Sequence, residues 1–476
     1  MFLVAFGLAA VVRGIAMFAY RPVLWFNGDS FEYMAVAHRL RPYRIRPDGY
    51  PAFLRLLQPL PHDLAVVAGL QHAMGLAVAA LLYALMRRHG LPGWGATLAV
   101  LPVLFDAYQI ELEHLAVSDL LAMLVGVAAL VLALWWRRPP FWAAALVGLL
   151  LAAALLVRTA TLPVVGLVMV FLLARRIGWR RFAVAGAALV LPLTAYAGWF
   201  DASNGSFRTL SSDGIFLYSR VQTFATCPTL HLPAVDRILC NATPVAQRPS
   251  PEWYIWHSGS PLYRLPGATF SNGKNALALS FAEHAIEQHP LTYLRTSWSD
   301  VWRAFRVHRT TFPNAITTEQ YSFSYSPTEI PMDRVYVPPD TAFADTTWYA
   351  HGTPPVTRVN HALAAFLIRY QRWIALPGPL LGVLFVIAGL GIAVGWRDRT
   401  SWTCATVLGL SAAALLAMPA LTAEFDYRYV LPVVPLISVA AAFAVKAIAS
   451  SHRRDLRSGL AVGGPAQAEA AEPAEV

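Results

Sequence analysis

The sequence predicts an all-α polytopic membrane protein with about ten transmembrane helices and a mixed loop domain outside the cytoplasm. Three observations lead to this prediction. The 476 residues are 57% hydrophobic and only 13% charged, which is about half the charged fraction of an average soluble protein. Apolar runs near the roughly 20 residues needed to cross a bilayer recur along the chain. Arginines gather in every second connection between these runs.

The apolar runs divide the chain into a membrane part and a loop part. We expect transmembrane segments near 2–20, 63–86, 92–110, 118–136, 141–157, 161–174, 182–200, 373–395, 402–421 and 429–448. The first run follows Met1 without a basic leader or a cleavage site of small residues, so we expect it to stay in the membrane. The predicted domains are an N-terminal transmembrane module (1–200), an extracytoplasmic loop domain (201–372), C-terminal transmembrane helices (373–450) and a disordered cytoplasmic tail (451–476).

The arginine pairs predict the orientation, because cytoplasmic connections are enriched in arginine. The pairs on alternate connections are Arg87 and Arg88, Arg137 and Arg138, Arg175 and Arg176, Arg180 and Arg181, Arg397 and Arg399, and Arg453 and Arg454. They place both termini in the cytoplasm and the stretches 21–62, 110–118, 158–161, 201–372 and 421–428 outside. We therefore expect a multi-pass protein of the cell membrane with its functional site on the outer face.

The net charge of +10 comes almost entirely from arginine, since lysine occurs only at Lys274 and Lys446. Such a charge suits anionic lipid headgroups. Nucleic acid is not expected as a partner, because no basic run interleaved with aromatic residues stands outside the membrane segments. The arginine bias, with much Ala, Leu, Val and Pro, fits a GC-rich bacterial genome.

The first outer loop breaks the charge pattern, and we expect the functional site there. It carries six arginines: Arg21, Arg39, Arg41, Arg44, Arg46 and Arg55. A bound anion would explain them, and two acids, Asp29 and Glu32, lie in the same loop. Asp29 begins a helix expected over 30–40, whose apolar face (Tyr33, Val36, Ala37 and Leu40) would lie on the membrane surface. The alternative is that Asp29 and Glu32 only form a capping box for that helix.

Other outer loops add acids and arginines. The second loop has Asp106, Gln109, Glu111, Glu113, His114 and Asp119, and later loops have Arg158 and the run from Glu424 to Tyr429. We expect sugar or acceptor contacts from the second loop, the alternative being a solvated loop. A metal site at Glu113 and His114 lacks a second histidine at ligand spacing. Arg13 lies inside the first span, where it either snorkels to the surface or faces a polar cavity.

The stretch 201–372 is too long for a connector, and we interpret it as a small external domain or lid. Helices are expected near 273–288 and 291–306. The second has an apolar stripe that fits either the membrane surface or the rest of the loop. Cys227 and Cys240 lie in this stretch and would suit a disulfide outside the cytoplasm, two free thiols being the alternative. Cys404 sits in an apolar run and is expected to pack there.

Four short motifs together resemble a known family. They are an Asp-x-x-x-Tyr element from Asp29 to Tyr33, a Pro-x-Gly-Tyr-Pro element over 47–51, the pair Ser118-Asp119, and an Arg-Tyr-x-x-Pro-x-x-Pro element over 428–435. This combination resembles the GT-C superfamily of integral-membrane glycosyltransferases that use polyprenyl-phosphate sugars. Protein O-mannosyltransferases and the lipid A aminoarabinose transferase are members. The resemblance covers roughly 1–200 and 373–450, and the 201–372 loop matches no pattern known to us.

The resemblance implies a transferase that moves a sugar from a polyprenyl-phosphate donor to an extracytoplasmic glycan, lipid or protein acceptor, with inversion. It implies that Asp29 is the catalytic general base. A leaving phosphate needs cationic stabilisation, for which Arg44, Arg46, Arg158 and Arg428 are candidates. The further residues expected to contact substrate are Glu32, Tyr33, Tyr50, Glu111, Glu113, His114, Asp119 and Tyr429. No metal ligands are assigned, and a divalent cation as cofactor stays open.

Two other classes of function stay open. A transporter or flippase of a lipid-linked or anionic substrate would need polar residues spread through the spans. A non-enzymatic membrane scaffold would not need acids on three separate outer loops. The enzyme interpretation requires Asp29, Glu113 and Arg428 around one outward-facing cavity beside a lipid groove.

Overall fold

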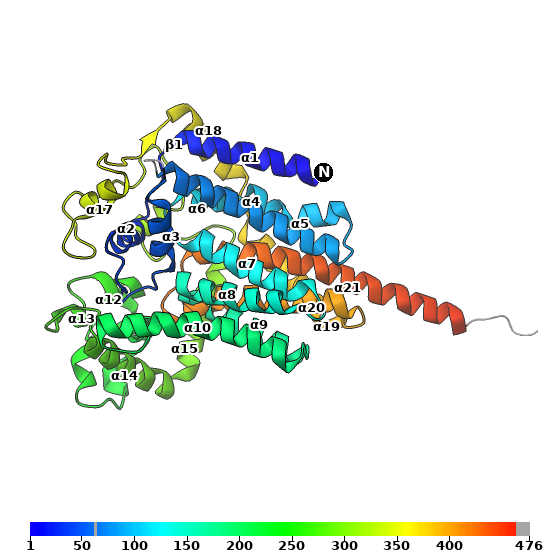
Figure 1. The fold of residues 1–476 in the computed structure, drawn as a ribbon. Coiled ribbons are helices and arrows are strands. Elements are labelled where there is room, and N and C mark those ends of the chain that lie inside the picture. The colour runs from blue at the N-terminus through cyan, green and yellow to red at the C-terminus, as the bar shows by residue number, and fades with distance from the viewer. Residues whose placement is uncertain (61–63, 463–476) are drawn as a thin grey trace, which may run out of the picture.

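The computed structural model describes residues 1–60 and 64–462. Long helices run side by side as a bundle, and short helices and loops gather at one end of it (Figure 1). We call this the loop end. The N-terminus and the far end of the last helix lie at the opposite end, which we call the terminal end (Figure 1). The last 14 residues of the predicted tail, 463–476, lie outside the described residues.

The bundle consists of α1 (Phe2–Ala19), α4 (Ala65–Arg88), α5 (Gly93–Phe105), α6 (Ala107–His114), α7 (Asp119–Trp135), α8 (Phe141–Val157), α9 (Leu162–Ala174), α10 (Trp179–Asn204), α18 (His361–Trp373), α19 (Gly378–Val394), α20 (Arg399–Thr422) and α21 (Val433–Val462). Within residues 1–60 and 64–462, five helices are long and apolar enough to cross a membrane, or up to seven spans are present if each bent pair counts as one. Three shorter apolar helices accompany them. The protein is thus mainly helical with several candidate spans, and the expected ten spans are not confirmed.

One predicted span is a bent pair of helices, and the span predicted over 373–395 forms a bent pair with a helix that was expected to belong to the loop domain. The run expected over 92–110 is divided at Asp106 into α5 and α6, which meet at 51°, and α18 and α19 meet at 50°. The Asp106 carboxylate accepts a bond from the Tyr108 amide at 3.0 Å and so caps α6. As a consequence, Glu113 belongs to a buried helix. The expectation of an exposed loop is therefore wrong for residues 110–114, which belong to this helix.

The loop end contains α2 (Asp29–Arg39), α3 (Gly49–Leu57), α11 (Asp213–Val221), α12 (Pro251–Trp256), α13 (Pro261–Arg264), α14 (Asn272–Gln288), α15 (Pro290–Val301), α16 (Ala315–Glu319) and α17 (Ala342–Tyr349). Six short 3-10 turns are η1 (Thr159–Thr161), η2 (Cys227–Thr229), η3 (Asp236–Leu239), η4 (Val245–Gln247), η5 (Trp302–Phe305) and η6 (Tyr427–Val430). Strands β1 (Tyr20–Arg21) and β2 (Arg358–Val359) pair antiparallel. This pairing ties the first loop to the segment that precedes α18.

Helix α2 is buried, which corrects the expectation that it lies on the membrane surface. Its residues from Asp29 to Ala37 are all buried. Ile330, Ala342 and Tyr349 pack in the same apolar cluster as Phe31 and Tyr33. The segment before β2 therefore covers α2, so that its polar residues face protein groups. Leu40 ends the helix in a left-handed conformation.

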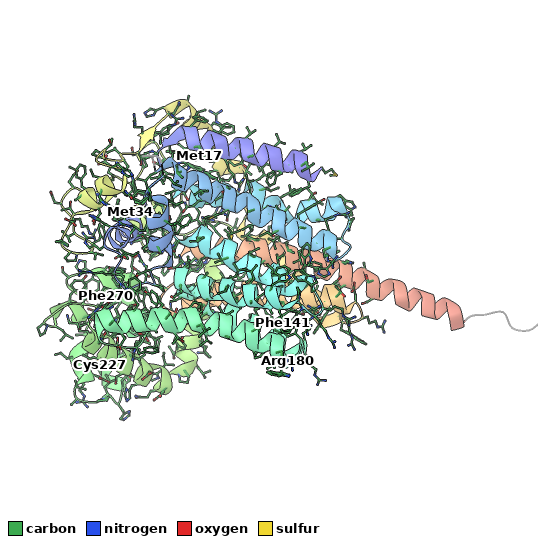
Figure 2. All side chains as sticks on the ribbon, in the orientation of Figure 1. Met17, Met34, Phe141, Arg180, Cys227 and Phe270 are labelled. Carbon is green, nitrogen blue, oxygen red and sulfur yellow. A yellow bond between two sulfur atoms is a disulfide. The ribbon has the colours of Figure 1, made fainter. Side chains whose placement is uncertain are left out.

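The long segment between α10 and α18 adds its own apolar cluster around α11 and α14. Cys227 and Cys240 are joined by a disulfide there. In Figure 2, Cys227 lies at the loop end, whereas Phe141 and Arg180 lie toward the terminal end. Helix α15 leaves Leu291, Leu294 and Trp298 of its apolar stripe exposed.

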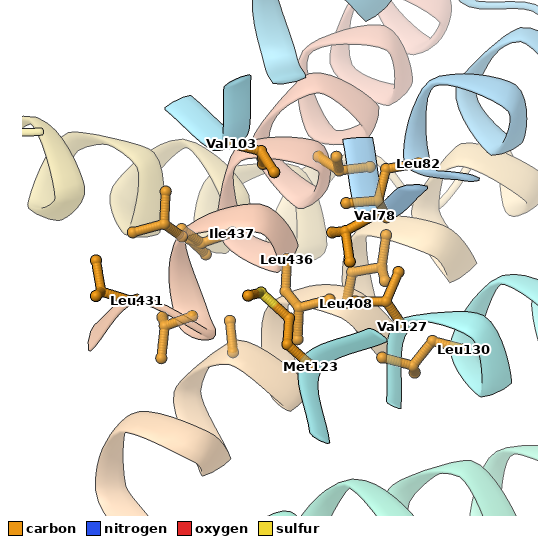
Figure 3. Close-up of a cluster of buried hydrophobic side chains, with 14 of the residues drawn as sticks. Val78, Leu82, Val103, Met123, Val127, Leu130, Leu408, Leu431, Leu436 and Ile437 are labelled. Atoms are coloured by element: carbon orange, nitrogen blue, oxygen red, sulfur yellow. The ribbon is translucent and has the colours of Figure 1, made fainter. Parts of the chain in front are cut away.

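The centre of the bundle is packed by aliphatic side chains from several helices. Val78 and Leu82 of α4 meet Val127 of α7, Leu408 of α20 and Leu436 of α21 (Figure 3). Burial of a side chain of this size stabilises the fold by about 1.5–3 kcal/mol in water, and inside a bilayer close packing takes over that role. This packing fixes the positions of the bundle helices relative to one another, and so of the loop-end residues that these helices carry.

Candidate functional site

Four charged side chains at the loop end form one ion-pair cluster. Asp29 Oδ1 accepts a bond from Arg46 Nη2 at 2.6 Å, and Asp29 Oδ2 accepts one from Arg428 Nη1, also at 2.6 Å. Glu32 Oε2 accepts a bond from Arg46 Nη1 at 2.6 Å. Asp29, Glu32 and Arg428 are each less than 8% exposed. Two carboxylates and two guanidinium groups thus balance each other in a buried position.

Local backbone features place Asp29. Gly28 precedes α2 with φ at +83°, a conformation that favours glycine over residues with a side chain. The Ser30 hydroxyl accepts a bond from the Phe26 amide at 2.9 Å and donates to the Ala116 carbonyl at 3.0 Å. These bonds fix the start of α2 against the turn after α6. Asp29 is the first helical residue, and both of its carboxylate oxygens accept bonds from arginines.

Arg428 is placed by its own neighbour. Asp426 precedes η6, and its Oδ1 accepts a bond from the Arg428 amide at 3.2 Å. The Tyr321 hydroxyl donates to Oδ2 of the same carboxylate. The Arg428 guanidinium lies 4.7 Å from the centre of the Phe26 ring. Cation–π contacts of this kind add attraction at a desolvated position, so the first loop holds Arg428 by an aromatic ring as well as by Asp29.

The two acids of the cluster differ in proton affinity. Burial raises the pKa of Asp29, but the guanidinium groups of Arg428 and Arg46 outweigh it and bring the pKa to about 2. Burial raises the pKa of Glu32 to about 7, against the attraction of Arg46 and with a further rise from the Asp29 charge. At neutral pH Asp29 is therefore ionised, while Glu32 is poised to exchange a proton.

A second ion pair lies next to this cluster. Arg158 Nη1 donates to Asp119 Oδ2 at 2.8 Å and to the Ser118 hydroxyl at 3.3 Å. The Tyr429 ring contacts both guanidinium groups, 5.1 Å from that of Arg158 and 5.4 Å from that of Arg428. The Tyr429 ring therefore connects the Arg158 pair to the cluster that contains Asp29.

An apolar groove begins at this second pair. Asp119, Arg158, Thr161 and Tyr429 are its polar lining residues. Apolar side chains of α7, α8, α9, α20 and α21 line the rest, among them Met123, Val127, Leu130, Leu151, Val165, Leu415 and Leu436. Four of these, Met123, Val127, Leu130 and Leu436, appear in Figure 3. The cavity volume is about 50 Å³, so a lipid chain could enter only if side chains moved. Methionine at Met123 is suited to such adjustment.

Other predicted site residues lie around the cluster. The Tyr33 hydroxyl bonds Ser118 Oγ at 2.8 Å, and its ring packs edge-on against Tyr50 at 4.9 Å. The Tyr50 hydroxyl donates to Gln71 at 2.8 Å. Arg44 lies elsewhere: its Nε donates to Asn204 Oδ1 at 2.8 Å. Arg44 therefore ties the first loop to the end of α10 and does not join the ion pairs.

Glu113 and His114 belong to a separate network inside the bundle. Arg13 binds both oxygens of Glu113, each at 2.7 Å. His72 bonds Glu113 Oε2 at 2.9 Å and His114 Nδ1 at 3.0 Å, and His114 Nε2 bonds the Tyr20 carbonyl at 2.7 Å. Arg13 thus neither snorkels nor faces an open cavity. The expected meeting of Glu113 with Asp29 and Arg428 does not occur, and Glu111 is likewise buried in α6.

Several neighbours were not among the predicted site residues. Asp426 belongs to the acidic run from Glu424 to Tyr429, but its sequence position does not indicate that it orients Arg428. Tyr321 lies in the long loop without any recognisable motif. Ser118 was part of the Ser118-Asp119 motif but was not expected to contact other site residues. Its hydroxyl bonds both Tyr33 and Arg158. For Phe26, the sequence gives no indication of a contact with Arg428 except that it lies three residues before Asp29.

One group of side chains has the spacing of a cation site. His38, Asp340 and Asp345 each offer a ligand atom within 4.8 Å of the others. Arg39, however, bonds Asp340 at 2.6 Å and approaches Asp345 to 3.0 Å. Its guanidinium already supplies the positive charge that the two aspartates need, so this group is explained as an ion pair that holds α17 on α2.

Comparison with known proteins does not identify a family for this chain. No protein-family model matches the chain, and no curated protein matches it. Among solved structures, the fold is similar to a crystal structure of ArnT from Cupriavidus metallidurans in the apo state. The two share 13% identity at a TM-score of 0.34, over 93% of this chain and 77% of that one. A likeness at that TM-score does not establish a function, so the function is proposed from the site itself.

Proposed function

We propose that the protein is a membrane glycosyltransferase of GT-C type that moves a sugar from a polyprenyl-phosphate donor to an acceptor at the loop end, with inversion. The observation that carries the proposal is the Asp29 carboxylate, held by Arg428 and Arg46, next to the polar mouth of an apolar groove. A carboxylate, guanidinium groups and an intramembrane groove are what transfer from a lipid phosphate requires. The loop end would face outward, in the cell membrane.

The groove would take the polyprenyl chain of the donor. Its walls are aliphatic, and its polar mouth contains Arg158. A guanidinium group binds phosphate oxygens with two parallel N–H bonds, and it keeps its charge at any physiological pH. Arg158 and Arg428, which both lie within 5.4 Å of the Tyr429 ring, would hold the donor phosphate together. Arg44, which is engaged with Asn204, is no longer proposed as a phosphate ligand.

Asp29 would act as the general base. The acceptor hydroxyl would attack the anomeric carbon, forming the new C–O bond while the bond to the phosphate oxygen breaks. Its proton would pass to Asp29, and polyprenyl phosphate would leave with the electron pair. The donor phosphate competes with Asp29 for Arg428, so donor binding would release one carboxylate oxygen from its ion pair. That release would raise the basicity of Asp29 at the moment when the base is needed.

Two rival functions are less well supported. A transporter would use polar groups within the spans, and the chain has such a set around Arg13 and Glu113. These groups bond one another, and none of them lines the apolar groove. A scaffold would have no use for the convergence of loops from both ends of the chain on Asp29. The ion-pair cluster therefore favours an enzyme.

The experiment is incubation of the protein in reconstituted vesicles with a panel of polyprenyl-phosphate sugars and candidate glycan, lipid and protein acceptors. We expect release of polyprenyl phosphate with one donor, with loss of release in Asp29→Asn. A matched control is Asp340→Asn, which also removes an aspartate paired with an arginine but lies outside the cluster. Movement of intact lipid across the bilayer without sugar release would instead indicate a flippase and reject the proposal.

A second test concerns the donor phosphate. Arg158→Lys keeps the charge but loses the fork of N–H groups, so we expect weaker donor binding with a smaller effect on the rate at saturation. Arg44→Lys is the control, because Arg44 bonds only neutral groups. Equal effects of both substitutions on the donor KM would contradict the assignment of Arg158.

A further inference from the structure

A second cavity at the loop end is separate from the apolar groove. Its volume is about 460 Å³. It lies between η5 and the residues after it, the bend between α18 and α19, and η6. The residues of the η6 turn divide the two spaces, since Tyr427 lines this cavity and Tyr429 lines the groove. We call it the basic cavity, after the side chains that line it.

Four arginines line the basic cavity, Arg303, Arg306, Arg309 and Arg372, together with His308 and a single acid, Asp106. The Asp106 carboxylate accepts bonds from two backbone amides, those of Tyr108 and Leu376. Arg309 lies over the ring of Tyr108 at 3.4 Å. The lining therefore carries a clear excess of positive charge over negative charge.

Two of these arginines have no partner among the described residues. Arg303 donates to Asp300 at 2.9 Å, whereas the guanidinium groups of Arg306 and Arg372, two exposed residues, make no hydrogen bond or ion pair with another described residue. Elsewhere at the loop end, arginines meet carboxylates: Arg46 and Arg428 are examples. Like charges that face one cavity repel each other, and an anion bound between them removes that repulsion. The free guanidinium groups thus point to an anionic ligand.

The rim of the basic cavity is apolar. Trp302, Val307 and Trp373 are 55%, 68% and 82% exposed, and Trp302 continues the exposed apolar stripe of α15. Tryptophan is enriched where protein meets the membrane surface. Pro377, Gly378 and Leu381, at the start of the apolar helix α19, line the cavity. The cavity therefore opens where α19 would enter the bilayer.

The position of Arg306 is fixed by close packing. A Cβ atom added at Gly378 would lie 2.2 Å from the Arg306 carbonyl oxygen. Only a residue without a side chain lets the end of η5 approach α19 this closely. Phe305 also packs edge-on against Phe385 of α19 at 5.6 Å. The arginine is thus held at the start of a membrane helix and not on a free loop.

We propose that the basic cavity binds the phosphate group of an anionic amphiphile, with its apolar chain along the exposed rim. Arg306, Arg309 and Arg372 hold the phosphate oxygens, because guanidinium groups match them in shape and charge. Trp302 and Trp373 lie beside the chain where it passes into the outer part of the bilayer. This site is independent of sugar transfer, since it uses none of the residues assigned to the donor or to the base.

The test measures binding to the purified full-length protein in neutral detergent. The probes are a short-chain phosphatidylglycerol, a short-chain phosphatidylcholine and inorganic phosphate. Arg306→Gln/Arg372→Gln removes the two unpaired charges. The matched control is Arg237→Gln/Arg264→Gln, which removes two exposed arginines from the same long segment. Arg306→Lys/Arg372→Lys restores the charge without the planar fork.

We expect phosphatidylglycerol to bind at least tenfold more tightly than phosphatidylcholine or inorganic phosphate. The glutamine pair should lose at least tenfold in phosphatidylglycerol affinity, the lysine pair should lose less, and the control pair should bind like the wild type. Equal loss in the control pair would show unspecific charge attraction and overturn the proposal. Equal affinity for inorganic phosphate and phosphatidylglycerol would reject the amphiphile and leave a site for soluble phosphate. Because sugar release is not measured, failure of the glycosyltransferase proposal would not affect this outcome.

Discussion

Asp29 and Arg428 lie 399 positions apart in the chain, yet Arg428 Nη1 donates to Asp29 Oδ2 at 2.6 Å. The pair joins the loop after α1 to the turn before α21. The proposed site is therefore complete only when the last two bundle helices are in place. A chain that ends before α20 lacks one of the two guanidinium groups that keep Asp29 ionised.

Asp29→Asn is expected to lower the rate of sugar transfer by about 10²–10⁴-fold, the usual effect of losing a general base. The amide keeps the size of the side chain but cannot accept a proton. The measurement is single-turnover transfer in vesicles, with Asp340→Asn as the control. With Asp29 as base, the pH profile of the rate should keep its shape in Glu32→Gln, because the rate would not follow the Glu32 carboxyl, whose pKa is about 7. A limb near pH 7 that disappears in Glu32→Gln would assign the base to Glu32 instead.

The sequence predicted the helices well and their environment less well. The run expected over 141–157 coincides with α8, because an uninterrupted apolar stretch has few alternatives to a buried helix. The bend at Asp106 was missed, although this aspartate interrupts the apolar run and is a residue type that commonly caps the start of a helix. The burial of α2 was also missed. It depends on a covering segment more than 290 residues away, whose docking has no local sequence signal.

The sequence predicted that acids and arginines from distant loops gather, but it did not predict how they pair. Asp29, Glu32, Arg46 and Arg428 were all expected near a phosphate, because acids and arginines gathered on loops of one side. Which arginine meets which acid depends on distances of a few ångström between distant loops, and no spacing rule gives these. For the same reason Glu113 was expected beside Asp29, whereas its charge is matched by Arg13.

Glu32 should make the stability of the protein depend on pH. Its pKa is raised by burial to about 7, above the value of about 4.3 for an unfolded chain. The unfolded state thus loses this proton first, so the contribution of Glu32 is fully present below about pH 4 and is lost as the pH rises toward 7. The loss is on the order of 3 kcal/mol by the usual conversion of pKa differences.

Denaturation of the wild type and Glu32→Gln between pH 4 and pH 8 checks this expectation. The wild type should lose stability across the range, and the variant should lose clearly less. Glu287→Gln, at an exposed position of α14, should behave like the wild type. Parallel curves for the wild type and Glu32→Gln would mean that Glu32 is ionised at pH 5 and would contradict its raised pKa.

The orientation of the chain is open to a direct test. The loop end should face outward, because the arginine pairs lie on connections such as 136–140 at the other end of the bundle. A reporter inserted after Arg138 or Arg181 should be active as a cytoplasmic marker, and one placed within 201–372 as an external marker. The reverse pattern would put the ion-pair cluster in the cytoplasm and remove the proposed donor from its reach.

Arg13→Met should be among the most destabilising substitutions in the bundle. Arg13 is 2% exposed and binds both oxygens of Glu113, and it also donates to the Leu104 carbonyl at 2.8 Å. Removing one partner leaves a buried charge without compensation, which typically costs about 3–5 kcal/mol. Arg13→Met/Glu113→Met removes both charges, so it should recover part of that loss, although His72 then lacks one partner.

Unfolding in mixed detergent measures both variants, and Arg137→Met, at an exposed position, is the control. Should the double variant prove less stable than Arg13→Met, the two side chains would not act as a pair, and their bonds to the backbone would explain the buried charge.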